Sequence, residues 1–412
     1  MVDAVIDACG KREARIRLVP ARVVVYLLLA AGLFAHLGWG LVWDKLVTGL
    51  RPGPGPRPSG SALFYARKRL GATPLRALFD LLAGPGAAAA RWQGLLVLAI
   101  DGTQIDVPDT AANRERLGLH DAGHARAGYP QVRLLALVAA GTRSLLAARW
   151  GTSRDTEQTL ATGLLPHLGP GHLLLADRGF AAAAFLDRFA ETGTEVLVRI
   201  PAHWRPKILA RLADGTRLVQ IGKRRWRLIE AEITINTTGG SRTGAYRLAT
   251  TLTDPADHSA LGLVELYHQR WEIETVYMEL KSALLRRKVL RSGDPAGLDQ
   301  EIWALLCLYQ ILRSAIDNAC TTGDLTPIGA SFKLALECAR DQVIQAAGII
   351  DDEQIDLAGR IGAELIAQPL PKRRLRTAPR AIKRAISKHR AKGTVTRRTY
   401  KATLEIALIN SP

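Results

Sequence analysis

Cysteine is scarce in this chain, and the few cysteines that occur stand far apart. The 412 residues contain four of them, and none forms a Cys-x-x-Cys pair or a cluster with histidine. A structural zinc site is therefore not expected. Four scattered cysteines also make no disulfide framework, so we expect a protein of a reducing compartment such as the cytoplasm. The positions concerned are Cys9, Cys307, Cys320 and Cys338.

Acidic residues are in short supply relative to basic ones. There are 38 Asp and Glu against 56 Lys and Arg, which gives a formal net charge of +18 and a pI of about 10.2. Acids are absent from residues 371–401, where Lys and Arg are dense. This balance favours a polyanionic partner, nucleic acid first and an anionic membrane surface second. The basic segment suits a phosphate backbone, whose counterions it would release, although a solvated tail without a fixed role has the same composition.

Charge is missing from one long apolar stretch, at 23–43. Its length would suffice to cross a membrane as a helix. However, His36 and two nearby glycines interrupt it, and a charged pair follows directly at 44–45. We interpret the stretch as two buried helices of a small domain, broken near 36–40, and expect no membrane association.

The pattern of apolar residues along the chain predicts five parts. The first is a small helical domain with basic edges, which we expect to bind DNA, although a helical scaffold for protein contacts would look similar. Two parts form an α/β core, and a β-rich insertion with turn-forming glycines separates them. The last part is helical and carries the basic tail. The expected bounds are 1–90, 91–200 (core, first part), 201–255 (insertion), 256–320 (core, second part) and 321–412.

Continuous apolar runs in the first part of the core predict strands that are buried on both faces. Three such strands come first, and then a helix, a strand, a helix and a strand follow. This order is that of an RNase H-like α/β domain. The predicted strands are 95–100, 132–140, 144–150, 172–176 and 195–200, and the predicted helices are 156–168 and 181–191.

Two aspartates directly follow apolar strands of this predicted core. Asp101 comes after the first strand and Asp177 after the fourth. Side chains just beyond strand ends are rigidly held and reachable by a ligand, and a carboxylate there is costly unless it meets a cation or a good partner. The alternative is that each caps a turn or pairs with an arginine, as Asp177 could with Arg178. Asp106 and Asp109 are weaker candidates because they lie in a predicted loop.

The most specific pattern is a stripe on the helix predicted near 258–290. At about 100° per residue, Tyr267, Arg270, Glu274 and Lys281 project within roughly 60° of one another. The cations suit phosphate oxygens, and the lone acid between them suits a metal ion. A solvated face would also be charged, but it would rarely place one acid between two cations above two strands that end in aspartate.

The other residues of this helix have simpler expected roles. Glu272 and Glu279 lie off the stripe and are the weaker candidates for a metal ligand. The opposite side is apolar, and we expect it to pack on the sheet. That side holds Leu266, Trp271, Val276 and Leu280.

These motifs together resemble the bacterial transposases of the "insertion sequence four" family, which are DDE transposases. The family's third motif reads Y-x2-R-x3-E-x6-K, and Tyr267, Arg270, Glu274 and Lys281 match it at every position. The resemblance covers nearly the whole chain, including the helical N-terminal domain and the β-rich insertion. Its other sequence features are DGT at 101–103, ADRGF at 176–180 and PARVVVYLLLA at 20–30.

The resemblance implies a two-metal mechanism. Asp101, Asp177 and Glu274 would hold two Mg²⁺ ions, or Mn²⁺ in their place, about 3.5–4 Å apart. One ion would activate a water for attack on the phosphodiester, and the other would stabilise the leaving 3′ oxygen. The freed 3′ hydroxyl would then form a hairpin at the transposon end and later attack target DNA. Arg270 and Lys281 would position phosphates, with Tyr267 hydrogen-bonding nearby.

Hairpin formation requires a flipped base, which an aromatic ring usually receives. Tyr246 in the insertion is the candidate here, although Trp226 or Trp204 could serve instead and Tyr246 could simply pack in a strand. The expected partners are duplex DNA, both transposon inverted-repeat ends and target, and a second copy of the chain on that DNA. The expected location is the cytoplasm, at the nucleoid.

Three alternatives share parts of this pattern. A metal-dependent nuclease without strand transfer would need the same three acids. A DNA-binding protein derived from a transposase but inactive would have lost one of them, and all three are present. A tyrosine recombinase would use a tyrosine nucleophile and would leave Asp101 and Asp177 without a role.

Overall fold

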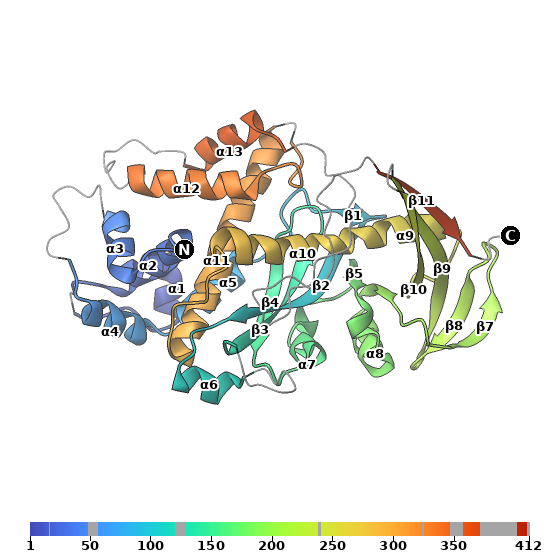
Figure 1. Ribbon diagram of the computed structural model, residues 1–412, viewed down its shortest axis with the longest axis horizontal. Coiled ribbons are helices and arrows are strands. Elements are labelled where there is room, and N and C mark those ends of the chain that lie inside the picture. The colour runs from blue at the N-terminus through green and yellow to red at the C-terminus, as the bar shows by residue number, and fades with distance from the viewer. Residues whose placement is uncertain are drawn as a thin grey trace.

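The computed structural model describes the chain in eight segments. The basic segment 371–401 lies outside them, so its predicted contact with DNA stays a prediction. Helices gather at one end of the molecule, and a long sheet crosses the middle and forms the other end (Figure 1). The described residues are 1–15, 17–47, 57–119, 128–237, 240–323, 325–346, 357–370 and 402–409.

The N-terminal part is helical, as the sequence predicts. The uncharged stretch forms two helices, of which the first ends at Leu33 and the second begins at Trp39, so the predicted break is confirmed. Among the described residues, no helix is both long and apolar enough to span a membrane. The helices are α1 (Val2–Ala8), α2 (Ala21–Leu33), α3 (Trp39–Val47), α4 (Gly60–Leu70) and α5 (Thr73–Leu82).

The strands form one continuous sheet in the described part of the chain. Its order is β4-β3-β2-β5-β6-β10-β9-β8-β7, with β1 on β2 and β11 on β9. Strands β2, β5 and β6 are parallel, β3 is antiparallel to β2, and β4 is antiparallel to β3. The core strands are β1 (Arg91–Trp92), β2 (Leu95–Asp106), β3 (Gln131–Ala139), β4 (Leu145–Gly151), β5 (His172–Ala176) and β6 (Glu195–Arg199).

The β-rich insertion does not form a separate layer. Its last strand pairs antiparallel with β6, so the insertion lengthens the core sheet. We expected a helical C-terminal region, and the structure differs at 402–408, where a strand pairs with β9. Apolar residues alternate there with polar or small ones, and the edge of β9 supplies the hydrogen-bonding partners. These strands are β7 (Lys207–Arg211), β8 (Arg217–Ile221), β9 (Arg224–Thr237), β10 (Gly240–Thr250) and β11 (Ala402–Leu408).

Helices cover both faces of the core sheet, which explains its unbroken apolar strands. In β5, Leu173 and Leu175 belong to the cluster with α9, whereas Leu174 belongs to the cluster with α8. Successive side chains of a strand point to opposite faces, so both sets must be apolar. The long α11 packs against α2, α5 and α13 at the helical end of the molecule (Figure 1).

The remaining helices lie between the strands of the core and in the C-terminal part. They are α6 (Ala111–Leu117), α7 (Glu157–Thr162), α8 (Ala183–Glu191), α9 (Ala260–Tyr267), α10 (Trp271–Met278), α11 (Pro295–Thr322), α12 (Phe332–Ala346) and α13 (Leu357–Ala367). A 3-10 turn at 268–270 joins α9 to α10, and a π-helical turn at 279–284 follows α10. The segment from α9 to this π turn crosses the sheet (Figure 1).

Candidate functional site

The two predicted aspartates lie at the same level of the sheet. Strands β2 and β5 are parallel neighbours, and the last pair in register is Ile100 with Ala176. Asp101 and Asp177 are the next residues on each strand. One detail differs from the prediction, because Asp101 lies within β2, which continues to Asp106 along β3. The pairing with β5 nevertheless stops at Ile100, so both carboxylates stand where the parallel sheet opens.

The two carboxylates are held by local backbone amides. Asp101 Oδ1 accepts a hydrogen bond of 2.8 Å from the Gly102 amide, and Asp177 Oδ1 accepts one of 2.8 Å from Gly179. Asp177 therefore caps the 3-10 turn at 178–180, which was the alternative role for this residue. In the described part of the chain it forms no ion pair with Arg178, which is exposed.

Arg270 links Glu274, the third predicted acid, to Asp101. Its guanidinium lies 3.6 Å from Asp101 Oδ2 and 3.4 Å from Glu274 Oε1. The side chain of Arg270 is only 12% exposed, and those of both acids are 20% exposed. A partly buried guanidinium thus bridges a carboxylate of β2 and a carboxylate of α10. The structure therefore brings three of the predicted residues together.

The electrostatics of Asp101 are unusual for an aspartate. Burial raises its pKa from an ordinary value of 3.8 to about 6, and the negative charges of Asp177 and Glu157 act in the same direction. The Gly102 amide and Arg270 oppose the shift. The charged form of Asp101 is therefore disfavoured mainly by its burial, with a smaller contribution from the neighbouring acids.

Glu157, at the first position of α7, is a fourth acid that the sequence analysis missed. A β-carbon on Gly102 would overlap the Glu157 carboxylate, and one on Gly179 would lie 3.7 Å from Glu157 Oε2 and 3.0 Å from Asp177 Oδ1. Burial and the charge of Asp177 raise the pKa of Glu157. In the sequence this residue looks like an ordinary acid in the first turn of a helix, stabilised by the helix dipole. Only the fold carries it to the other acids.

Two tyrosines attach the helix of Glu274 to the strands that carry the aspartates. The hydroxyl of Tyr267 donates to the backbone oxygen of Ala176 at 3.1 Å, and that of Tyr277 donates to the backbone oxygen of Asp101. Burial raises the pKa of both hydroxyls. Tyr267 is only 4% exposed, so its hydroxyl is used inside the protein instead of facing open solvent. Nothing in the sequence pattern singled out Tyr277.

The predicted stripe is not carried by one regular helix. The 3-10 turn at 268–270 and the π turn at 279–284 change the rotation per residue on both sides of Glu274. Lys281 lies in the π turn, and burial lowers its pKa while the charge of Asp106 opposes that shift. Of the four residues expected to pack on the sheet, Trp271 is 38% exposed, whereas Leu266, Val276 and Leu280 are buried.

The two glutamates off the stripe belong to a buried charge network. Arg143, in the turn between β3 and β4, pairs with Glu272 and lies 3.4 Å from Glu279. Glu279 also pairs with Arg313 and accepts a 3.0 Å hydrogen bond from Tyr309 of α11. Every carboxylate in this network therefore has a partner. The network joins the Glu274 helix to the sheet and to α11.

The aromatic candidates in the insertion differ in their exposure. Tyr246 is half-buried, with the guanidinium carbon of Arg199 4.4 Å from its ring centroid and the ring of Tyr267 6.5 Å away. Trp226 is fully buried in the cluster beside α8, so the alternative that it receives a base does not fit this packing. Trp204 is partly buried against the same cluster.

The donor set at the site suits a hard divalent cation. Within the described segments, no three acidic, histidine or cysteine side chains already stand close enough to hold an ion. However, a β-carbon on Gly102 would overlap the Glu157 carboxylate, one on Gly179 would lie 3.0 Å from Asp177 Oδ1, and Asp101 Oδ1 accepts a hydrogen bond from the Gly102 amide. Oxygen ligands of this kind are those that Mg²⁺ and Mn²⁺ take in proteins. The donor types present here are therefore those that such an ion takes.

Two family models match this chain, one over its N-terminal helical part and one over the part that contains the core sheet. The family model described as "Transposase DDE domain" matches residues 92–311, which contain all four acids, and that described as "Insertion element 4 transposase N-terminal" matches residues 1–80. The chain is 29% identical over 345 residues to the transposase InsG for insertion sequence element IS4 of Escherichia coli strain K12, covering 80% of this chain and 78% of that protein. Among solved structures it is similar to piggyBac transposase in a synaptic complex with hairpin DNA, with a TM-score of 0.44, 13% identity, and coverage of 90% of this chain and 81% of that one.

Proposed function

Because this chain belongs to the DDE transposases of the insertion sequence 4 family, we propose that it is a cut-and-paste transposase. It cleaves DNA at the two ends of its own element and joins the freed 3′ ends to target DNA. Two observations support this proposal: Asp101 and Asp177 directly follow the last registered pair of β2 and β5, and Arg270 bridges Asp101 and Glu274.

The core is RNase H-like in this proposal. The order β4-β3-β2-β5-β6, with β2, β5 and β6 parallel, supports that assignment. Residues 91–200 and 256–320 are the two parts of this core, and 201–255 are the insertion. Residues 1–90 bind the ends of the element, and 321–412 end in the basic segment that follows the DNA backbone.

Asp101, Asp177 and Glu274 would hold two divalent cations, with Glu157 as a fourth carboxylate at the same place. Bound there, such ions supply an activated water and a charge that stabilises the leaving 3′ oxygen. Arg270 holds the carboxylates of Asp101 and Glu274 in place relative to each other, because it contacts both. Its planar guanidinium can also donate to phosphate oxygens. Lys281 contributes a second cation for the phosphates. Tyr267 acts as a positioning residue through its bond to Ala176.

The chemistry consists of exchanges at phosphorus without a covalent enzyme intermediate. Water attacks the phosphodiester at the element's end, and the bond to the 3′ oxygen breaks. The free 3′ hydroxyl then attacks a phosphodiester of the opposite strand, whose bond to the 3′ oxygen of the flanking DNA breaks. The resulting hairpin is hydrolysed by water before strand transfer. Tyr246 is the proposed receiver of the flipped base, because it is half-buried beside Arg199 and Tyr267. A homodimer in the cytoplasm, at the nucleoid, would hold both ends.

An excision assay tests the proposal. A plasmid carries the gene between its native flanking DNA, and wild type is compared with Asp177→Asn. We expect excision by wild type only. Equal excision by both proteins would show that Asp177 is not a metal ligand, and the mechanism would be wrong.

A second assay separates transposition from the alternative of a nuclease. Pre-cleaved ends with free 3′ hydroxyls are supplied with a target plasmid, and covalent joining is measured. A nuclease without strand transfer cleaves uncut ends but does not join pre-cleaved ones. An inactive DNA-binding derivative does neither, although it still binds the ends.

A further inference from the structure

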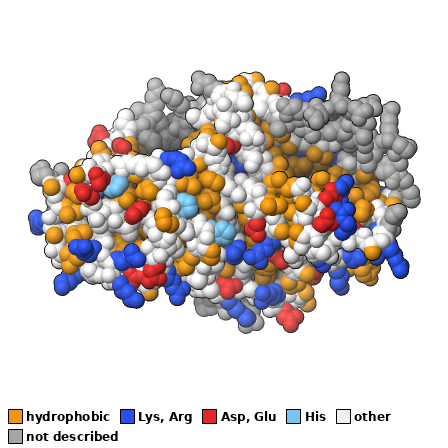
Figure 2. Space-filling view, turned by 180° about the vertical axis from the view of Figure 1, so that it is seen from behind, with side chains coloured by type: hydrophobic (Ala, Val, Ile, Leu, Met, Phe, Trp, Pro, Cys, Tyr) orange, Lys and Arg blue, Asp and Glu red, His pale blue; other side chains and the backbone are white. Residues whose placement is uncertain are grey.

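Basic side chains alone do not single out a DNA-binding face. Viewed from behind, Lys and Arg side chains are scattered over much of the surface (Figure 2). Some of the basic residues in the N-terminal part already pair with acids. Arg12 pairs with Asp7, and Arg22 pairs with Asp3. A specific anion site therefore has to be sought where cations gather without carboxylate partners.

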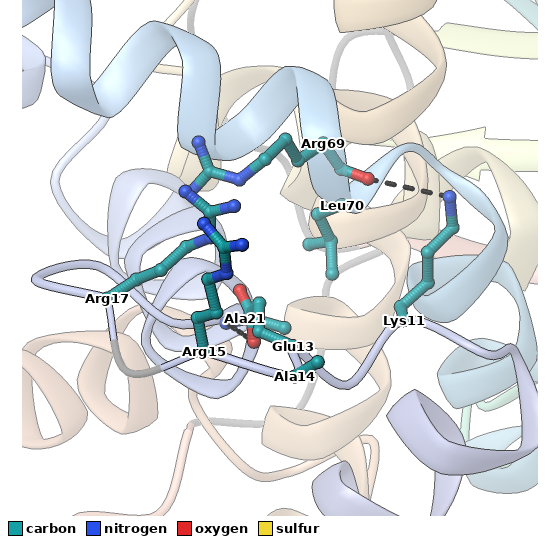
Figure 3. Close-up of a pocket in the computed structure, with 8 residues that line it drawn as sticks. All are labelled: Lys11, Glu13, Ala14, Arg15, Arg17, Ala21, Arg69 and Leu70. Carbon is teal, nitrogen blue, oxygen red and sulfur yellow. Dashed lines mark hydrogen bonds between the residues drawn. The ribbon is translucent and has the colours of Figure 1, made fainter.

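Such a gathering lies in a pocket of the N-terminal helical part. The pocket has a volume of about 220 Å³ and lies between the segment that joins α1 to α2 and the end of α4. The cations that line it are Lys11, Arg15, Arg17 and Arg69. Figure 3 shows the guanidinium groups of the three arginines close to one another on one side, with Lys11 on the other.

The charge in this pocket is not neutralised by the protein's own residues. Four cations and one acid line it, which leaves a formal charge of 4 − 1 = +3. The acid, Glu13, accepts a 3.0 Å hydrogen bond from the Ala21 amide and thereby serves the start of α2. None of the four cations forms a salt bridge with a carboxylate among the residues whose placement is described. Like charges held together in this way repel each other unless an anion joins them.

The contacts of these cations leave most of their donors available. Lys11 Nζ donates to the Arg69 backbone oxygen at 3.4 Å, and one Arg69 nitrogen lies 3.5 Å from the Val19 oxygen. Arg15, Arg17 and Arg69 are exposed at the mouth of the pocket. The guanidinium fork matches the oxygens of a phosphate group in pairs. The pocket thus offers three guanidinium groups and one ammonium group to the oxygens of a phosphate.

We propose that this pocket binds a backbone phosphate of duplex DNA when the N-terminal helices dock on an end of the element. The inference rests on the proposed function, since it supplies a contact between that part of the chain and its substrate. A phosphate contact sets the position of the protein on the duplex and carries no sequence information of its own. Its loss should therefore weaken binding to any duplex by the same factor.

The test compares two double variants of equal charge. Arg15→Gln/Arg17→Gln changes the pocket, whereas Arg12→Gln/Arg22→Gln removes two paired arginines from the same helical part. Affinity is measured by fluorescence anisotropy for the native terminal duplex and for a scrambled duplex, at several salt concentrations. We expect the pocket variant to bind both duplexes about tenfold more weakly at low salt, with a log–log salt slope smaller by about 1. The control variant should stay within about twofold of wild type.

Further measurements control for misfolding and for binding of a free anion. Thermal melting checks that both variants fold, and the single variants Arg15→Gln and Arg17→Gln should each give part of the effect. Equal DNA affinity of pocket and control variants would overturn the proposal, and so would a wild type that binds no duplex. Calorimetric titration with inorganic phosphate identifies a site for a free anion: tight phosphate binding together with unchanged DNA affinity also overturns it. Joining of pre-cleaved ends is scored separately, so the proposed function can stand when the pocket fails, or fail when the pocket stands.

Discussion

The Tyr267 hydroxyl donates a 3.1 Å hydrogen bond to the backbone oxygen of Ala176, the residue directly before Asp177. A matching bond runs from Tyr277 to the backbone oxygen of Asp101. The two tyrosines flank Glu274 on its own helical segment. These two hydrogen bonds fasten the helical segment of Glu274 to the backbone beside Asp101 and Asp177.

Replacing Tyr267 with Phe removes one of these bonds and leaves the buried Ala176 oxygen without that donor. We expect a loss of about 1 kcal/mol in the free energy of unfolding and slower DNA cleavage at unchanged DNA affinity. Urea unfolding, cleavage rates and anisotropy measure the three quantities. Tyr65→Phe is the control, because Tyr65 is 59% exposed in α4. A fall in DNA affinity with unchanged stability would instead make Tyr267 a DNA contact.

Asp101→Asn should stabilise the metal-free protein at neutral pH. The pKa of Asp101 is raised from 3.8 to about 6 in the folded state, so between these values the folded protein binds more protons than the unfolded chain. Stability therefore falls as pH rises from about 4 to 6 and stays lower above that range. The penalty at pH 7.5 corresponds to about 3 kcal/mol.

Urea unfolding in EDTA at pH 4.5 and pH 7.5 measures this difference. The gain from Asp101→Asn should be small at the lower pH and reach about 2–3 kcal/mol at the higher one. A variant that is less stable than wild type at pH 7.5 would contradict the cost of burying the Asp101 charge.

Glu157→Gln should weaken binding of divalent cations without unfolding the protein. Its carboxylate approaches Gly102 and Gly179 beside Asp177, so its removal takes away one oxygen ligand and one negative charge. We expect Mn²⁺ affinity, measured by calorimetry, to fall about tenfold, in the range seen when groups supporting a metal are removed. Glu115→Gln, an exposed acid of α6, is the control. If Asp177→Asn abolishes Mn²⁺ binding while Glu157→Gln binds like wild type, Glu157 is not part of the site.

The buried network around Arg143 should matter far more than a surface ion pair. Arg143→Met removes the cation paired with Glu272, in a site where the Arg143 side chain is 5% exposed, whereas Glu279 keeps its pair with Arg313. The expected loss is about 3–5 kcal/mol. Arg22→Met breaks the exposed pair with Asp3 and should cost at most about 1 kcal/mol. Chemical denaturation of both variants measures the contrast, and equal losses would refute the structural role of the network.

Several elements follow from the sequence because they depend on burial alone. A strand covered on both faces must be apolar throughout, so the apolar runs at 95–100 and 172–176 suffice to place two core strands. An aspartate that ends such a run needs a cation or a strong partner, which singled out Asp101 and Asp177. The Tyr267-to-Lys281 motif identified the family through its spacing, and the interruption near His36 predicted two helices in place of one.

Other features depend on contacts between distant segments, which spacing does not encode. Glu157 lies near Asp177 and Gly102 because the chain after β4 folds back toward the ends of β2 and β5. The angle between Tyr267 and Lys281 departs from that of a regular helix because a 3-10 turn and a π turn flank α10. The strand at 402–408 exists because β9 offers an edge for it. Local patterns thus determined which residues are candidates for the chemistry, whereas packing and hydrogen bonding across the sheet decided which of these candidates lie together.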